Sequence, residues 1–191
     1  TFQVYYGGIW AYSDELQINY KGIPIDPMYK PEYSPQLLRS LMYINHLQLI
    51  PNTLFESVGG YREGFEGSQD HDLALRISEH AKPQHIHSTA YLWRRGTSTL
   101  SVEDGRIGDL SIDASRRALE DHFERRGLVA DVRPYFLEPA PGKQPQATGT
   151  FVSRIIPSTV PKTSIVIPCK LGSTTVVGTD TIKVLEHCLL S

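Results

Sequence analysis

The sequence predicts an α/β protein in which a mixed sheet is flanked by helices. Short apolar runs typical of strands alternate with segments whose apolar residues recur at helical spacing, such as Leu73, Ile77 and Ala81. Glycines and prolines, for example Gly59 and Gly60, separate the two kinds of segment. With 191 residues, of which 40% are hydrophobic, the chain is long enough for one domain and part of another.

The first half of the chain begins with a predicted strand over 9–12, directly followed by Asp14 and Glu15. Acids at this position lie at the carboxyl end of the strand, where α/β sheets bind ligands. The proline-rich stretch 20–35 predicts a long surface loop. The elements expected after it are a helix over 36–41, a strand over 44–50 and a helix over 51–58 that ends at Gly59-Gly60.

The second half opens with a predicted helix that runs from Gln69 to about His80. The elements expected after it are short strands over 84–87 and 89–93, a loop over 96–108 and a long helix over 111–126. Gly127 stands where a left-handed residue ends such a helix. Further short strands are predicted over 153–157 and 164–168, each cut off by a proline.

The composition of residues 134–161, rich in proline and glycine, predicts a linker between two domains. Residues 1–133 then form the first domain. Residues 162–191 contribute the first strand and helix of a second domain, and that helix stops without a cap, as expected of a truncated unit.

Charge and hydrophobicity exclude several classes of partner. The formal net charge is −2, so the whole chain offers no basic face for nucleic acid. No apolar run approaches the roughly 18 residues of a transmembrane segment. Cys169 and Cys188 belong to no ligand spacing, which favours a reducing compartment. We expect a protein of the cytoplasm or of the cytoplasmic face of the membrane.

The segment 51–73, which contains GGYREGFEGSQDHDL, is the most specific signal in the sequence. It resembles the acidic motif of bacterial family 2 glycosyltransferases of the GT-A fold, particularly those that join two such domains in tandem. The resemblance covers most of 9–135 and resumes near 163. It implies an incomplete GT-A domain, with a Rossmann-like sheet that belongs to the nucleotide-diphospho-sugar transferases. Residues 1–133 would be its acceptor-side, catalytic-base half.

The same resemblance implies roles for the acids of this motif. Asp70 stands where the family has its catalytic base, with Gln69 where many members have Glu. A carboxylate suits this task because an acceptor hydroxyl is a poor nucleophile until a base takes its proton. Asp72 is a second candidate for contact with donor or acceptor, although capping the helix or orienting a neighbour is the simpler interpretation.

Two other segments resemble the family's donor side. AYSDEL (11–16) is similar to the DxD motif, which implies donor contacts by Asp14 and Glu15 and a Mg²⁺ or Mn²⁺ ion on Asp14. Leu16 replaces the second metal-binding acid, and Leu92 replaces a histidine that completes the site in related enzymes. Trp93 and Arg94 are the remaining candidates for donor or acceptor binding. His85, which precedes them, is more typical of a structural histidine than of a ligand.

We therefore expect an inverting glycosyltransferase of bacterial cell-envelope polysaccharide biosynthesis, with a nucleotide-sugar donor and a glycan acceptor. The alternative is a degenerate GT-A domain that binds a glycan or scaffolds a partner without turnover, which the two leucines favour. An exposed sheet edge in such a fragment invites pairing with another chain, so homodimerisation is a further expectation.

Overall fold

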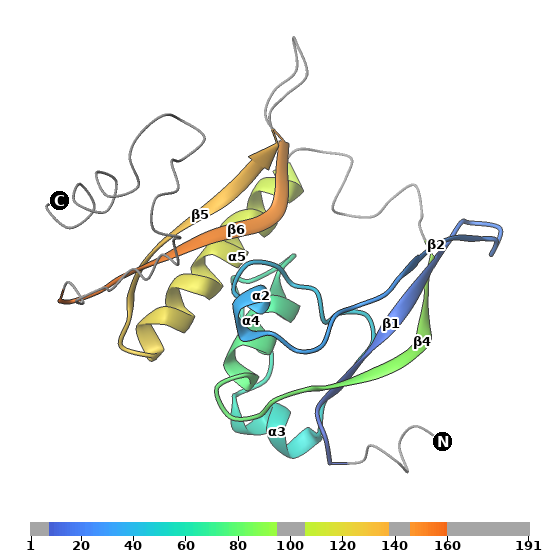
Figure 1. Ribbon diagram of the computed structural model, residues 1–191, viewed down its shortest axis with the longest axis horizontal. Helices are drawn as coiled ribbons and strands as arrows, with labels where there is room; N and C mark the ends of the chain where they lie inside the picture. Colours follow the sequence, from blue (N-terminus) through green and yellow to red (C-terminus); the bar gives the residue numbers. More distant parts are fainter. Residues whose placement is uncertain (1–7, 95–105, 138–145, 160–191) are drawn as a thin grey trace, which may run out of the picture. The chain divides into compact units, whose positions relative to one another are not determined.

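The computed structural model describes residues 8–94, 106–137 and 146–159 (Figure 1). The chain divides into two units, Thr1–Pro157 and Ser158–Ser191, and nearly all described residues belong to the first. The predicted strand over 164–168 and the terminal helix of the second domain lie outside the described residues. The predicted α/β class with a mixed sheet is confirmed.

A four-stranded mixed sheet is built around β1 (Ala11–Ile18). Strand β4 (Gln84–Arg94) runs parallel along its whole length. Strands β2 (Pro24–Met28) and β3 (Gln48–Leu49) pair antiparallel with different parts of β1. The central strand β1 and its parallel neighbour β4 are therefore about 70 residues apart in sequence.

Strands β3 and β4 differ in length from the predicted strands. The strand predicted over 44–50 is only Gln48–Leu49, because the residues before it form an irregular loop that supplies side chains to the site. The strands predicted over 84–87 and 89–93 form one strand, β4. Its pairing with β1 skips residues between Ile86 and Thr89, and this bulge explains the apparent interruption in the sequence.

The short helices have recognisable end signals. Helix α2 (Pro35–Leu38) starts after Ser34, whose hydroxyl accepts a hydrogen bond from the Leu37 amide. Helix α3 (Asn52–Ser57) is followed by Gly60, which has φ 66°, and a Cβ there would lie 3.0 Å from the Phe55 ring. Only glycine fits this backbone without strain.

Helix α5 (Arg106–Arg125) packs against α4 (Gln69–Ile77) and against a hairpin formed by β5 (Val129–Leu137) and β6 (Gln146–Ile156) (Figure 1). The helix begins five residues earlier than predicted, and Gly127 after it has the expected positive φ of 66°.

The stretch predicted as a linker, 134–161, contains the end of β5 and all of β6, so the structure differs from that prediction over 134–137 and 146–156. The strand predicted over 153–157 is the last part of β6. The proline and glycine content outweighed a strand signal in Thr150, Phe151 and Val152. Phe151 is buried in the core, and its amide donates to the Ser40 carbonyl at 2.7 Å. This part of the chain therefore belongs to the packed unit.

One hydrophobic core connects these elements. Its largest fully buried side chains come from β1, from α2 and the loop after it, from α4 and from α5. They are Trp10, Tyr12, Leu38, Ile44, Leu73, Leu75, Ile77, Leu119 and Phe123. Helix α4 is buried nearly all round after its first residues, and the buried set includes the polar side chains of His71, Asp72 and Arg76.

Asp72 lies at the centre of a buried ion-pair cluster with Arg62 and Arg76. Its carboxylate has no exposed surface and accepts from both guanidinium groups, with Arg76 Nη2 at 2.7 Å. Arg76 also donates to the carbonyls of Val58 and Gly60 at 2.6 Å each. Burial raises the pKa of Asp72, but the hydrogen bonds from the two arginines outweigh it and hold the pKa below its ordinary value.

This cluster corrects one expectation from the sequence. Asp72 was a candidate for donor or acceptor contact, yet a fully buried carboxylate that is saturated by two arginines has no access to a ligand. Its role is to fix α4 against the end of α3, and through the bond from Arg62 to Asp121 (2.8 Å) against α5.

We expect Asp72→Asn to destabilise the fold by about 3–5 kcal/mol, because it leaves the buried Arg76 guanidinium without its counter-charge. Urea unfolding at neutral pH measures this. Since the folded pKa of Asp72 is depressed, the stabilisation is present above the unfolded pKa of about 3.9 and is lost as the pH falls through the folded value.

The matched control is Asp121→Asn, which removes a half-exposed carboxylate from the same Arg62 and should cost less than about 1 kcal/mol. Equal losses in the two variants would contradict the central role of Asp72.

Candidate functional site

The two acids of the predicted donor side lie within β1, not after its end. Asp14 and Glu15 are both buried, because β1 continues to Ile18 between β2 and β4. The predicted strand ended at Tyr12, just before the first charged residue, Asp14. Buried charges of this kind are stable only with partners, and the structure supplies a separate set for each carboxylate.

Asp14 is held by His85 and by the backbone of the loop after β2. Its Oδ1 accepts from His85 Nε2 at 2.8 Å and from the Lys30 amide at 2.9 Å. The His85 ring stacks on Tyr12, its cross-strand partner, with centroids 4.8 Å apart. This bond agrees with the interpretation of His85 as a structural histidine, but it uses only one of the two ring nitrogens, Nε2.

Glu15 is held by His46 and Lys30. Its Oε2 accepts from the His46 amide at 3.0 Å, lies 3.2 Å from His46 Nδ1 and forms an ion pair with Lys30 Nζ at 3.6 Å. Burial raises the pKa of Glu15, but the bonds from His46 and the charge of Lys30 bring it below its ordinary value. Burial also lowers the pKa of Lys30, and for this ammonium it outweighs the attraction of Glu15.

Aromatic side chains of β4 cover His46. Its ring stacks on Tyr91 with centroids 5.2 Å apart and lies 5.6 Å from Trp93. Trp93 is half-buried, and the exposed Arg94 beside it donates to the Tyr20 carbonyl at 3.0 Å. Of the two predicted binding residues, Trp93 therefore lies against a partner of Glu15, and Arg94 follows it on the same strand.

The residues around Asp14 do not fit a Mg²⁺ or Mn²⁺ site at this corner. Such ions take a shell of oxygen ligands. Leu16 and Leu92, which replace the two expected ligands, are direct cross-strand partners in the β1–β4 pair. An apolar pair therefore occupies the positions of the missing ligands, and Asp14 is already paired with His85.

Asp70 lies in the first turn of α4, where the helix dipole favours a negative charge. It is half-buried, its Oδ2 accepts from Asn45 Nδ2, and its Oδ1 accepts from the His71 amide at 2.8 Å. Gln69 beside it is exposed. Because Asn45 and His46 are consecutive, one loop holds both Asp70 and Glu15 and brings the two predicted halves of the site together.

The start of α4 is fixed by contacts with α5. Ser68 Oγ donates to the Ser111 carbonyl at 2.7 Å, and Ser111 Oγ donates to the Gly67 carbonyl at the same distance. Gly67 has φ 84°, and a Cβ there would lie 3.1 Å from Ser111. The glycine permits this close approach, which sets the position of Asp70 three residues later.

Asn45, His46 and Lys30 were not predicted from the sequence. Asn45 and His46 fall in a segment that was interpreted as a strand, and Lys30 in one interpreted as a surface loop. The one available signal was the pair of consecutive polar residues Asn45-His46 inside a mostly apolar run. A pair of this kind is unusual for a buried strand.

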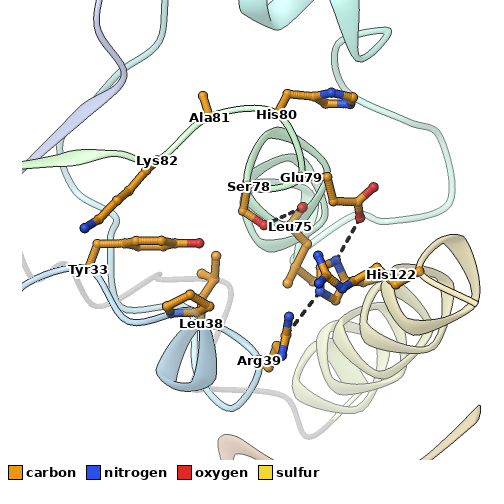
Figure 2. A pocket seen from close by; sticks show the side chains of 12 residues that line it. Tyr33, Leu38, Arg39, Leu75, Ser78, Glu79, His80, Ala81, Lys82 and His122 are labelled. Atoms are coloured by element: carbon orange, nitrogen blue, oxygen red, sulfur yellow. Dashed lines mark hydrogen bonds and ion pairs between the residues drawn. The ribbon is translucent and has the colours of Figure 1, made fainter. Parts of the chain in front are cut away.

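A separate pocket of about 370 Å³ lies between α2, the end of α4 and α5 (Figure 2). Figure 2 shows the His122 ring between Arg39 and Glu79. Arg39 Nε donates to His122 Nε2 at 3.2 Å, and His122 Nδ1 donates to Glu79 Oε1 at 2.8 Å. Burial lowers the pKa of His122 to about 4, so the ring is neutral at physiological pH.

Comparisons with known proteins identify two similar sequences. The chain is 37% identical over 160 residues to the O-antigen biosynthesis protein RfbC of Myxococcus xanthus, an alignment of 83% of this chain with 12% of that protein. It is 36% identical over 154 residues to the uncharacterized protein y4gI of Sinorhizobium fredii (strain NBRC 101917 / NGR234), which covers 77% of this chain and 17% of that protein. The chain thus spans a small part of either relative. No protein-family model matches the chain.

None of the described helices is a candidate for a membrane-spanning segment. Within residues 8–94, 106–137 and 146–159, none combines the length and the apolar composition of a bilayer-spanning segment.

The buried neutral His122 makes stability depend on pH. Because its folded pKa of about 4 lies below its ordinary 6.5, its contribution is complete above pH 6.5 and is lost as the pH falls toward 4, by roughly 3 kcal/mol. Charged groups face it from each side: Arg39 on α2, Glu79 after α4 and Arg125 on α5.

His122→Gln keeps a donor for Glu79 and an acceptor for Arg39 but does not titrate. Urea unfolding between pH 7 and 4.5 should therefore show a smaller loss of stability in this variant than in the wild type. Buried His71, whose pKa burial also lowers, contributes equally to both proteins and cancels in the difference. Parallel stability curves would contradict the neutral state of His122.

Proposed function

We propose that this chain forms the acceptor-side, catalytic-base part of a glycosyltransferase that acts in polysaccharide biosynthesis. The name of the Myxococcus xanthus relative, O-antigen biosynthesis protein, supports the polysaccharide role. The resemblance of 51–73 to family 2 enzymes supports the transferase reaction. The donor would be a nucleotide sugar and the acceptor a growing glycan, in the cytoplasm or at the cytoplasmic face of the membrane.

The observation that carries the proposal is the contrast between two acids in one helical turn. The Asp72 carboxylate is buried and paired with two arginines. Asp70, in contrast, keeps exposed surface and is oriented by Asn45 and by the His71 amide. A carboxylate that is held in place yet accessible can accept a proton from a bound hydroxyl.

In the proposed reaction, the acceptor hydroxyl oxygen attacks the anomeric carbon of the donor sugar while Asp70 takes the hydroxyl proton. The bond from that carbon to the diphosphate oxygen breaks, and the nucleoside diphosphate leaves with the electron pair. A single displacement of this kind inverts the anomeric configuration. Asn45 acts as a positioning residue that holds Asp70 toward the acceptor.

On the donor side, the exposed Arg94 offers a positive charge for the leaving diphosphate. Trp93 and Tyr91 offer aromatic faces for a sugar or a base. Asp14 is hydrogen-bonded to His85 and Glu15 is paired with Lys30, so we assign both acids to the structure of this part of the sheet, and the proposed reaction has no metal step at Asp14.

The second candidate function is a glycan-binding or scaffolding domain without turnover. The observation that favours it is the cross-strand pair of Leu16 and Leu92, which stands where the related enzymes have metal ligands. The two functions differ in one measurable respect: a binding domain would retain glycan affinity and show no dependence on Asp70.

We expect Asp70→Asn to lower the transfer rate by about 10²–10⁴-fold, because the amide cannot take the acceptor proton. The rate is measured as release of nucleoside diphosphate and formation of glycan product, in the longest natural chain that contains these residues. Circular dichroism checks the fold.

Asp113→Asn is the matched control, since Asp113 is an exposed aspartate of α5 whose ion pairs, within the part of the chain that the structure describes, are with Arg116 and Arg117 of the same helix. It should leave the transfer rate unchanged. A transfer rate that Asp70→Asn does not alter would remove Asp70 from the mechanism. Glycan binding without any turnover in the wild type would favour the second function.

A further inference from the structure

Three side chains with metal-ligating atoms lie close together next to Asp14, and none of them has a part in the proposed reaction. His85 and His87 are two residues apart at the start of β4, and Glu32 comes from the loop between β2 and α2. One ligand atom of each lies within 4.8 Å of the other two. The bulge of β4 begins at His87, which frees this residue from regular pairing with β1.

The separations within this cluster suit a small ion. Glu32 Oε1 lies 2.8 Å from His87 Nε2 and 3.8 Å from His85 Nδ1, and the two imidazole rings are 4.3 Å apart. Four-coordinate zinc has bonds of about 2.0–2.2 Å, which puts its ligand atoms roughly 3.4 Å from each other. The three groups can therefore share one ion after shifts of about one ångström or less.

His85 Nδ1 is the atom that points to a ligand. The side chain of His85 is 2% exposed, and among the described residues Nδ1 is the buried side-chain polar atom without a hydrogen-bond partner. Buried polar atoms are rarely left unpaired. Since the Asp14 carboxylate can only accept, Nε2 carries the proton in the neutral ring and Nδ1 presents its lone pair to the cluster.

The contact between His85 and Asp14 is also the arrangement expected around a bound metal. Ligating histidines commonly donate their other ring N–H to a carboxylate, which fixes the tautomer and makes the ligating nitrogen more basic. Tyr12 stacks on the same ring at 4.8 Å and holds its plane. A simple surface ion pair between Glu32 and His87, both 72% exposed, explains none of these features of His85.

We propose that Glu32, His85 and His87 form a binding site for a divalent transition ion of borderline softness, of which Zn²⁺ is the fitting example. Two imidazole nitrogens and one carboxylate oxygen suit Zn²⁺ and not Mg²⁺ or Ca²⁺, which prefer oxygen alone. The carboxylates of Glu32 and Asp14 together balance the charge of the ion. Three protein ligands leave a fourth position open to water or to a ligand.

The test uses the full chain with Cys169→Ser and Cys188→Ser, because free thiols would bind the same ions. Isothermal titration with Zn²⁺ should give one site per chain, and Co²⁺ should give the visible absorption of a four-coordinate nitrogen and oxygen site. Mg²⁺ should give neither signal nor competition. These readouts do not depend on any enzymatic activity.

His87→Ala and Glu32→Gln should each weaken Zn²⁺ binding at least tenfold. Both side chains are exposed, so these variants should fold, which circular dichroism checks. His80→Ala removes an exposed histidine that does not belong to the cluster and should change nothing. Absence of Zn²⁺ binding, or binding that survives both cluster variants, would overturn the proposal.

Discussion

The position of the proposed base depends on the ion-pair cluster of Asp72, Arg62 and Arg76. This cluster has no exposed carboxylate surface, and its bonds extend to Val58, Gly60 and Asp121. It thereby connects the end of α3, the glycine-rich turn, α4 and α5 at one point. Asp70 is two residues from Asp72 in the same helical turn, so a shift of α4 would displace Asp70 from Asn45. One acid of the motif supplies rigidity, and the other is left available for chemistry.

The pairing of β1 with β4 is the second constraint on the site. It brings together residues about 70 positions apart, and their side chains meet according to the register: Tyr12 with His85 and Leu16 with Leu92. The first pair forms a stacked, hydrogen-bonded contact beside Asp14, and the second is apolar. Because the two leucines are cross-strand partners, a metal-ligating residue at either position would face an apolar side chain and have no second ligand opposite it.

Much of the fold follows from local patterns in the sequence. Helices α4 and α5 were predicted within a few residues at most boundaries because their apolar residues recur over two or more turns. Only the last part of strand β6 was predicted, within the strand over 153–157, because prolines and glycines around its first part resemble a linker and the burial of Phe151 comes with a distant contact to Ser40. Asp70 was proposed as the base from the resemblance of its motif, and that role stays a prediction. Asn45, His46 and Lys30 were missed because their roles depend on long-range contacts that no local pattern encodes.

The partners of the buried acids decide which chemistry this corner supports. Glu15 has Lys30 and His46, and Asp14 has His85 and the Lys30 amide, so neither carboxylate needs an external cation to be stable in the folded chain. Among the described residues, the buried side-chain polar atom without a hydrogen-bond partner is Nδ1 of His85, whose other ring nitrogen bonds Asp14. The Asp14 carboxylate thus makes the His85 nitrogen a more basic ligand and does not itself act as an oxygen ligand. That difference changes the preferred ion from a hard cation to one that accepts imidazole.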